Sequence, residues 1–334
     1  HFVRRRQRQM CIRDRHKRVL ITGGHGFIGC HVSRLLIKQG HTVGIVDSYR
    51  DYNHYSQHNI GEYEKVRTLR KDHAGDTEIY ETDILDDLGL ENAFAKFRPD
   101  VVIHLASCPN AKILQFNARE ETETAIQGTL RVLEMSVKYG VHRFVLSSSS
   151  MVYGNFKVDE PDEIHKCFPQ TLYGSYKLAN EFMVKSFNKD NPQLTYSILR
   201  PSAVYGTNDV TMRVISQMAK SAYENNEITV TGPTNRLDFT WVEDLSEAFS
   251  LAAFHDGAMN QTFNASRGRG RNILEAAELV KHHLGIDCKI WTKSADPFYP
   301  NRDTLNSRKL KHQTGWNPQV DIEEGIKRYI EYFL

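Results

Sequence analysis

Short hydrophobic runs rich in β-branched residues alternate with longer amphipathic stretches between residue 19 and about residue 200. We predict that the short runs are strands, and they lie at 19–22, 42–46, 78–80, 101–105, 143–147 and 195–199. Strands that alternate with helices form βαβ units, which build a parallel sheet with helices on both faces. The unbroken apolar run Val101-Val102-Ile103 is typical of a strand that is buried on both sides. The pattern therefore predicts an α/β fold.

The longer stretches carry a helical period, and residues 127–139 are an example. Leu130, Leu133 and Val137 are spaced there at i, i+3 and i+7. Side chains at this spacing lie on one side of a helix. We therefore predict a helix over residues 127–139, with these three residues on one face.

The chain has 334 residues, which is long enough for two lobes. The regular alternation loosens beyond about residue 205, so we expect residues 17–205 to form one domain. Residues 206–334 are then a smaller lobe, interleaved with the last strands of the sheet. Hydrophobic residues make up 40% of the chain and charged residues 25%, as in ordinary globular proteins. No apolar run approaches the roughly 18 residues of a membrane helix, which predicts a soluble protein.

The cysteines indicate the compartment. There are five, an odd number, and none forms a CxxC pair. This pattern argues against a disulfide framework or a zinc site, and it favours a reducing compartment. We therefore expect a cytoplasmic protein without a metal centre.

The first residues differ from the rest in charge. Residues 1–18 hold eight Lys or Arg and one acid, a net +7, so the remainder of the +2 chain carries −5. A basic arm could bind nucleic acid or an acidic membrane. It lacks the apolar segment and cleavage site of a targeting peptide, and part of it resembles translated sequencing adapter. We expect residues 1–16 to be a disordered tail or a sequence scar, and the acidic remainder to have no nucleic-acid partner.

A glycine-rich loop follows the first predicted strand. Gly23, Gly26 and Gly29 are spaced as GxxGxxG before a helical pattern. Such glycines permit a sharp turn and a close approach to a pyrophosphate, and the helix N-terminus then supplies N–H groups to the phosphates. Asp47 ends the second strand 18 residues later, where an acid accepts hydrogen bonds from an adenosine ribose. It also repels a 2′-phosphate, which favours NAD over NADP, although Arg50 lies close by.

A tyrosine and a lysine form a candidate acid–base pair. Tyr173 and Lys177 are four residues apart in a helical stretch, so both side chains lie on one face. A cationic amine beside a phenol favours the phenolate, which makes the tyrosine a usable general base. This spacing also occurs by chance on many helices. The glycine loop and the run of serines at 147–150, which ends the fifth strand, favour the catalytic interpretation.

These motifs, in this order, resemble the extended short-chain dehydrogenase/reductases, and among them the NAD-dependent epimerase/dehydratase family that acts on nucleotide sugars. Further matching segments lie at 83–84, 104–107, 199–201, 204–206, 236–244 and 315–318. The resemblance implies a Rossmann-type doubly wound parallel sheet with a smaller C-terminal substrate-binding lobe. It also implies NAD as cofactor, a nucleotide sugar as substrate, and a homodimer that pairs through two helices.

The resemblance also implies roles for individual residues. The catalytic residues would be Ser149, Tyr173 and Lys177. Arg236 and Arg302 would clamp the diphosphate of the substrate, with Ser149 contacting the sugar, although each arginine could instead form a surface salt bridge. The residues that would bind the cofactor are Gly23, Gly26, Phe27, Ile28, Gly29, Asp47, Asp83, Ile84, Leu105, Ala106, Ser147, Tyr173 and Lys177.

Two positions depart from patterns within the family. Ala125 stands where relatives carry an asparagine that shapes the central helix, which puts the local packing in doubt. Relatives that remove water carry Asp-Glu after the catalytic serine or threonine, and relatives that decarboxylate carry a glutamate at the position of Met151. Ser150 and Met151 cannot move a proton at neutral pH. Dehydration and decarboxylation by those routes are therefore disfavoured, and epimerisation or simple oxidation or reduction is left. The leading hypothesis is an epimerase that acts at C4 through a keto-sugar.

Other functions stay open at this point. A sugar-nucleotide dehydrogenase or reductase needs the same residues, and a dehydratase could place its acid and base elsewhere. A regulator that binds the dinucleotide without catalysis would be expected to lose Tyr173 or Lys177, and both are present.

Overall fold

The computed structural model describes the chain in five segments. They comprise residues 16–50, 60–108, 118–209, 213–297 and 299–334. The predicted tail lies outside these segments apart from His16, whose ring Nε2 lies 2.7 Å from the hydroxyl of Thr42. In the described part of the chain, no helix is both long and apolar enough to cross a membrane.

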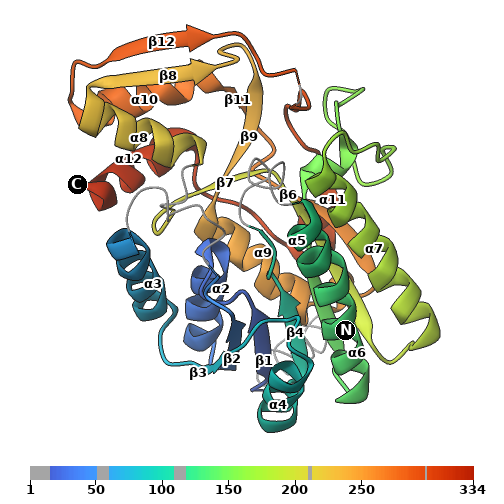
Figure 1. The fold of residues 1–334 in the computed structure, drawn as a ribbon. Helices are drawn as coiled ribbons and strands as arrows, with labels where there is room; N and C mark the ends of the chain where they lie inside the picture. Colours follow the sequence, from blue (N-terminus) through green and yellow to red (C-terminus); the bar gives the residue numbers. More distant parts are fainter. Residues whose placement is uncertain (1–15, 51–59, 109–117, 210–212, 298) are drawn as a thin grey trace, which may run out of the picture.

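The centre of the molecule is a seven-stranded sheet in the order β10-β6-β5-β4-β1-β2-β3 (Figure 1). All neighbouring strands in it are parallel. The strands are β1 (Arg18–Thr22), β2 (Thr42–Asp47), β3 (Glu78–Glu81), β4 (Val101–His104), β5 (Arg143–Ser147), β6 (Thr195–Pro201) and β10 (Gln261–Ala265). The first six coincide with the predicted strands to within two residues at each end. The order reverses between β1 and β4, so the sheet is doubly wound, as predicted.

Helices cover both faces of this sheet because its strands are apolar on both sides. In β1, Val19 and Ile21 belong to one core and Leu20 belongs to the other. The first core also contains residues of α2 (Phe27–Lys38), α3 (Ile60–Ala74) and α9 (Val242–Phe254). The second contains residues of α4 (Asp87–Phe97), α6 (Thr129–Lys138) and α7 (Leu172–Asp190). The result is a three-layer arrangement with the sheet in the middle.

A second lobe stands beyond the carboxyl ends of the central strands (Figure 1). It has its own core and two small sheets, ordered β11-β9-β7 and β12-β8. Its elements are β7 (Ala203–Tyr205), α8 (Val214–Asn225), β8 (Glu227–Thr231), β9 (Arg236–Trp241), β11 (Gly270–Asn272), α10 (Ile273–Leu284), β12 (Lys289–Lys293) and α12 (Ile322–Phe333). The chain returns to the main sheet between β9 and β11, where α9 packs on the sheet and β10 pairs with β6.

The remaining elements are short. They are α5 (Ala118–Thr122), the π-helix η2 (Glu123–Gly128), η3 (Ser150–Tyr153), η4 (Asp256–Ala258) and α11 (Arg308–Thr314). Four of the five cysteines lie in described residues, and all four are free thiols.

The helix predicted at 127–139 is present as the end of η2 and as α6, but its apolar face is only partly buried. Leu133 is buried, but Leu130 is 36% exposed. The buried positions of α6 include Thr129 and Ser136, whose hydroxyls donate to the carbonyls four residues earlier, at 2.6 Å each. Because these hydroxyls are satisfied within the helix, they can face the core. The apolar period alone therefore does not identify the buried face of this helix.

Candidate active site

The glycine loop leads directly from β1 into α2. Gly23 has φ +69°, a conformation that favours glycine. Gly26 is the N-cap of α2 and provides no side-chain cap, and the first turn of the helix contains no acidic residue. An added Cβ on Gly29 would collide with the backbone of Gly23 and Gly24, so the start of the helix packs tightly against the loop. The N-terminal N–H groups of α2 are thus suited to bind an anionic group.

One pocket above the carboxyl ends of the strands collects all thirteen residues predicted to bind the cofactor. It extends from the glycine loop and Asp47, past Asp83 and Ile84 after β3, to Leu105 and Ala106 after β4. Ser147, Tyr173 and Lys177 line its other end. Residues that are up to about 150 positions apart in sequence meet here because parallel strands end at the same edge of the sheet.

Asp47 is held in place at one end of the pocket. Its carboxylate accepts hydrogen bonds from the backbone N–H of His25 at 3.0 Å and of Tyr49 at 2.9 Å. Burial raises the pKa of Asp47, and these two bonds oppose that shift. Arg50 forms ion pairs with Asp83 at 3.7 Å and with Glu120 at 3.2 Å. The charge of Arg50 is therefore already balanced by carboxylates, which weakens the case for a 2′-phosphate at this end.

Replacing Asp47 with alanine should weaken NAD binding about tenfold to a hundredfold, because a charged acceptor for the ribose hydroxyls is lost. The preference for NAD over NADP should narrow in the same variant, since the repulsion of a 2′-phosphate is also removed. Asp47→Asn is the matched control, because it can still accept a bond from a backbone N–H. Dissociation constants for both dinucleotides measure the effect. Tighter binding of NADP than NAD by the unmodified protein would contradict the role of Asp47.

The opposite end of the pocket holds the candidate acid–base residues. The Nζ of Lys177 is buried, donates to the Ser147 carbonyl at 2.9 Å, and lies 5.6 Å from the centre of the Tyr173 ring. Ser149 caps η3, where its Oγ accepts a hydrogen bond from the Met151 backbone N–H at 3.2 Å. An added Cβ on Gly174 would lie 2.6 Å from the Met151 carbonyl oxygen. This close approach holds the turn with Ser149 against the helix with Tyr173.

The two predicted substrate arginines differ in their surroundings. The side chain of Arg236 is 46% exposed and its Nε pairs with Asp303 at 2.8 Å, so it takes part in a surface salt bridge. Arg302 lies closer to the catalytic residues, because its Nη1 donates to the Ser150 hydroxyl at 2.8 Å. The structure therefore does not place the two arginines in equivalent positions.

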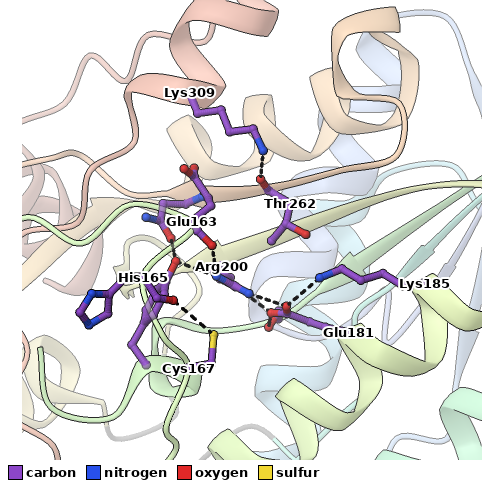
Figure 2. A network of polar contacts seen from close by, with 11 residues as sticks. Glu163, His165, Cys167, Glu181, Lys185, Arg200, Thr262 and Lys309 are labelled. Carbon is purple, nitrogen blue, oxygen red and sulfur yellow. Dashed lines mark hydrogen bonds and ion pairs between the residues drawn. The ribbon is translucent and has the colours of Figure 1, made fainter.

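A polar network surrounds Arg200 of β6 and Glu181 of α7 (Figure 2). Arg200 donates to both carboxylate oxygens of Glu181, at 2.8 Å and 2.6 Å. Ser148 also donates to Glu181, at 2.5 Å. Arg200 further donates to the hydroxyl of Tyr153, which donates to Asn264 at 2.7 Å. The network joins the residue after β5 to η3, α7, β6 and β10, so it holds the backbone on both sides of Ser149 in place.

Several residues that line the cofactor pocket were not predicted. His25 and Tyr49 stack with their ring centres 5.5 Å apart, and the Cζ of Arg67 lies 3.7 Å from the centre of the Tyr49 ring. Arg70 and Arg213 also line the pocket. Tyr49 could have been suspected from its place two residues after Asp47. The arginines carry no comparable signal, because α3 and α8 reach the pocket only through the tertiary fold.

Glu121 is a further residue that the sequence did not indicate. Its side chain is buried, and its Oε1 accepts a hydrogen bond from the Cys108 backbone N–H at 3.4 Å. Its Oε2 is enclosed and has no hydrogen-bond partner among the described residues. Burial raises the pKa of Glu121 to about 7, and the charge of Lys177 opposes this shift.

The raised pKa of Glu121 predicts a pH-dependent stability. An unfolded glutamate has a pKa of 4.5, so between pH 4.5 and about 7 the folded state binds more protons than the unfolded state. The free energy of unfolding should then fall as the pH rises through this window, by about 3 kcal/mol at most from this group. Glu121→Gln should remove most of the fall. Urea unfolding at pH 5 and pH 8 tests this, and an identical pH response of both proteins would contradict it.

Fold and site together define a dinucleotide-binding α/β protein. The model of the NAD dependent epimerase/dehydratase family matches residues 19–266, so the chain belongs to that family. A putative UDP-glucose 4-epimerase of Methanocaldococcus jannaschii is 28% identical, over 94% of this chain and 97% of the relative. A dTDP-D-glucose 4,6-dehydratase of Mus musculus is 27% identical, over 95% of this chain and 88% of the relative.

The fold of a solved structure is also similar. The UDP-glucose 4-epimerase of Thermotoga maritima, determined with UDP-glucose, superposes with a TM-score of 0.82 at 30% identity. The match covers 94% of this chain and 98% of that chain. The predictions of the family, the fold class and NAD as cofactor are thereby confirmed. Membership of the family does not by itself define the reaction or the substrate, because epimerases and dehydratases both occur among the relatives.

The pocket residues fit NAD. The uncapped N-terminus of α2 would hold the pyrophosphate, and the Asp47 carboxylate would accept bonds from the adenosine ribose. Lys177 and Tyr173 line the end of the pocket where the nicotinamide half would lie. When bound, NAD supplies the acceptor and the donor of a hydride.

Proposed function

We propose that the protein is a nucleotide-sugar 4-epimerase that uses tightly bound NAD. One observation carries the proposal: Tyr173 and Lys177 line the same pocket as the glycine loop, while the turn after Ser149 continues with a serine and a methionine. The site thus offers one acid–base relay beside a hydride acceptor. Epimerisation through a keto-sugar needs no more than these two functions, because the carbon that is oxidised is later reduced.

Each catalytic residue has a defined task in this proposal. Tyr173 acts as the general base: its phenolate oxygen takes the proton of the sugar hydroxyl and returns this proton when the keto-sugar is reduced. The Lys177 ammonium stabilises the phenolate through its positive charge. Ser149 donates a hydrogen bond to the reacting sugar oxygen. The keto-sugar turns in the pocket between the two half-reactions, so that hydride adds to its other face.

Met151 argues against elimination and decarboxylation at this site. It is buried in η3, directly beside the close contact with α7. Elimination requires one group to remove a carbon-bound proton and a second to protonate the leaving hydroxyl. Ser150 and Met151 supply neither at neutral pH.

Product analysis tests the proposal. The purified protein should convert a nucleotide sugar to a stereoisomer of unchanged mass, with no added reductant. A product that is lighter by one water or one carbon dioxide would overturn the epimerase and indicate a dehydratase or a decarboxylase. Net formation of NADH in proportion to substrate would instead support the second candidate, a sugar-nucleotide dehydrogenase that uses the same residues.

We further propose that two copies of the chain pair through α6 and α7, which lie next to each other (Figure 1). The outward side of α7 exposes Leu172 at 47% and Phe182 at 61%, and α6 exposes Leu130. Large apolar side chains on adjacent exposed helix faces are typical of a protein interface.

Replacing Phe182 with aspartate should therefore shift the protein from dimer to monomer, because a charge would be buried in the interface. Leu88→Asp is the matched control, since Leu88 is 83% exposed on α4, outside α6 and α7. Sedimentation velocity measures the oligomeric state. A monomer in the unmodified protein, or a dimer that persists in Phe182→Asp, would contradict the proposal.

A further inference from the structure

Arg70 is a buried cation that lines the cofactor pocket. It lies on α3 and is only 8% exposed. Its Nε and Nη2 both donate to the backbone carbonyl of Asn208, at 3.2 Å and 3.1 Å. Its Nη1 is not enclosed, and it has no hydrogen-bond partner among the described residues. The protein therefore holds one edge of the guanidinium and leaves the other edge without a partner.

Arg70 also lacks a counter-ion, since no carboxylate in the described part of the chain forms an ion pair with it. Arg67 lines the same pocket from the same helix, and it pairs with Glu81 at 3.1 Å and with Glu64 at 3.8 Å. The carbonyl of Asn208 is a neutral acceptor and cannot balance the charge of Arg70. A buried cation in such surroundings destabilises the protein unless a ligand supplies the opposite charge.

Two neighbouring groups show where the charge of Arg70 lies. Burial raises the pKa of the Cys30 thiol, in the first turn of α2, to about 12, and the charge of Arg70 opposes this shift. Burial also raises the pKa of Asp47 at the end of β2, and Arg70 is among the groups that oppose it. The guanidinium is thus within electrostatic reach of both the N-terminus of α2 and the carboxylate that would bind the adenosine ribose. In NAD, the group next to this ribose is the pyrophosphate, which carries all the negative charge of the cofactor.

We infer that Arg70 binds the pyrophosphate of NAD, and that the cofactor supplies the counter-ion which Arg70 lacks. Nη1 and the second N–H of Nη2 form a planar fork, which matches two phosphate oxygens. This role requires NAD as cofactor, but it does not depend on which reaction the protein catalyses.

The second lobe holds Arg70 in position for this role. Asn208 follows β7 and has φ +63°, a left-handed conformation that asparagine tolerates better than most residues. Its side-chain Oδ1 accepts a hydrogen bond from the hydroxyl of Tyr332 on α12, at 2.9 Å. Because β7 and α12 belong to the second lobe, that lobe contributes indirectly to the binding of the cofactor.

Three ligands that share adenosine test the role of Arg70, namely NAD, ADP-ribose and adenosine. ADP-ribose keeps the pyrophosphate, whereas adenosine has no phosphate. Arg70→Gln should weaken the binding of NAD and ADP-ribose about tenfold to a hundredfold, because charge-assisted hydrogen bonds are lost, and should change that of adenosine by about twofold at most. Arg34→Gln is the matched control, since Arg34 is an exposed arginine of α2 outside the pocket lining, and all three affinities should stay within about twofold. Dissociation constants of the full chain measure the effect.

The pattern across ligands separates the pyrophosphate from other roles. Unchanged affinity for ADP-ribose in Arg70→Gln would overturn the inference. Equal weakening of adenosine and ADP-ribose would also overturn it, and would show that Arg70 only shapes the pocket. A loss confined to NADP would overturn it as well, and would place Arg70 at the 2′ position of the ribose.

A second variant keeps the test decisive if Arg70→Gln does not fold, which its melting temperature shows. Arg70→Lys keeps the charge but loses the fork, so it should weaken ADP-ribose about threefold to tenfold and leave adenosine unchanged. Full affinity of Arg70→Lys for ADP-ribose would then overturn the inference. Product analysis with sugar nucleotides tests the proposed function separately, because it concerns the reaction and not the affinity for ADP-ribose.

Discussion

Replacing Tyr173 with phenylalanine is expected to lower turnover about 10³-fold or more while leaving NAD binding in place. The hydroxyl is the group that we propose exchanges a proton with the sugar, and loss of such a group costs about 10²–10⁴-fold. The phenyl ring fills the same volume, so the packing around Lys177 should persist. Turnover is measured as conversion of the sugar nucleotide, and the fraction of protein with bound NAD is measured on the same sample.

Two neighbouring substitutions serve as comparisons. Ser149→Ala should lower turnover on the order of 10²–10⁴-fold, because a hydrogen-bond donor to the reacting oxygen is lost. Met151→Leu should cost little, because an apolar volume is conserved in a buried position. Turnover by Tyr173→Phe within tenfold of the unmodified protein would show that another group carries the proton.

The central sheet could be predicted because its strands are buried on both faces. A run such as β1 or β4 has few polar interruptions, and each lies between helices, which leaves little choice of topology. The second lobe was harder to predict. Its strand β8 buries only alternate residues, and β12 is largely exposed. The two strands pair across about sixty residues of chain, so no local pattern connects them.

The helix at α6 shows why an apolar period can mislead. The apolar spacing placed Leu130 on one face with Leu133, yet Thr129 is fully buried and Leu130 is 36% exposed. A threonine hydroxyl that forms a hydrogen bond within its own helix can be buried in the core. A prediction from hydrophobic periodicity treats threonine as polar and therefore misses this. The exposure of Leu130 would be explained by packing of α6 against a second copy of the chain, as proposed above.

The cofactor pocket was largely visible in the sequence because its residues follow strand ends. Apart from Tyr173 and Lys177 on α7, each predicted segment lies at or just after the end of a parallel strand, and such strand ends converge at one edge of a sheet. Side chains that do not follow a strand end were either not predicted or were assigned a role only through the resemblance to the family. Glu121 and Arg302 lie on α5 and on the segment before α11, and their positions depend on the tertiary fold.

The second large effect that we expect is a loss of stability when the pair of Glu181 and Arg200 is broken. Both side chains are buried, at 1% and 4% exposure. Burial lowers the pKa of Arg200, but the hydrogen bonds to Glu181 outweigh this effect and raise the pKa above its ordinary value. Glu181→Gln keeps the shape and removes the charge, which leaves the Arg200 cation buried without a counter-ion. The free energy of unfolding should fall by about 3–5 kcal/mol, measured by urea denaturation.

A double variant and an exposed ion pair serve as controls for the effect of breaking the buried pair. Glu181→Leu with Arg200→Met removes both charges, so it should be less destabilised than Glu181→Gln, because no unpaired ion remains. Glu324 and Arg328 form an exposed pair at 2.7 Å, similar in distance to the buried one. Glu324→Gln should leave the unfolding midpoint close to that of the unmodified protein, since water screens exposed charges. If Glu181→Gln behaved like Glu324→Gln, the frame behind Ser149 would not depend on this buried pair, and Ser148 and Tyr153 would have to hold the serine turn without it.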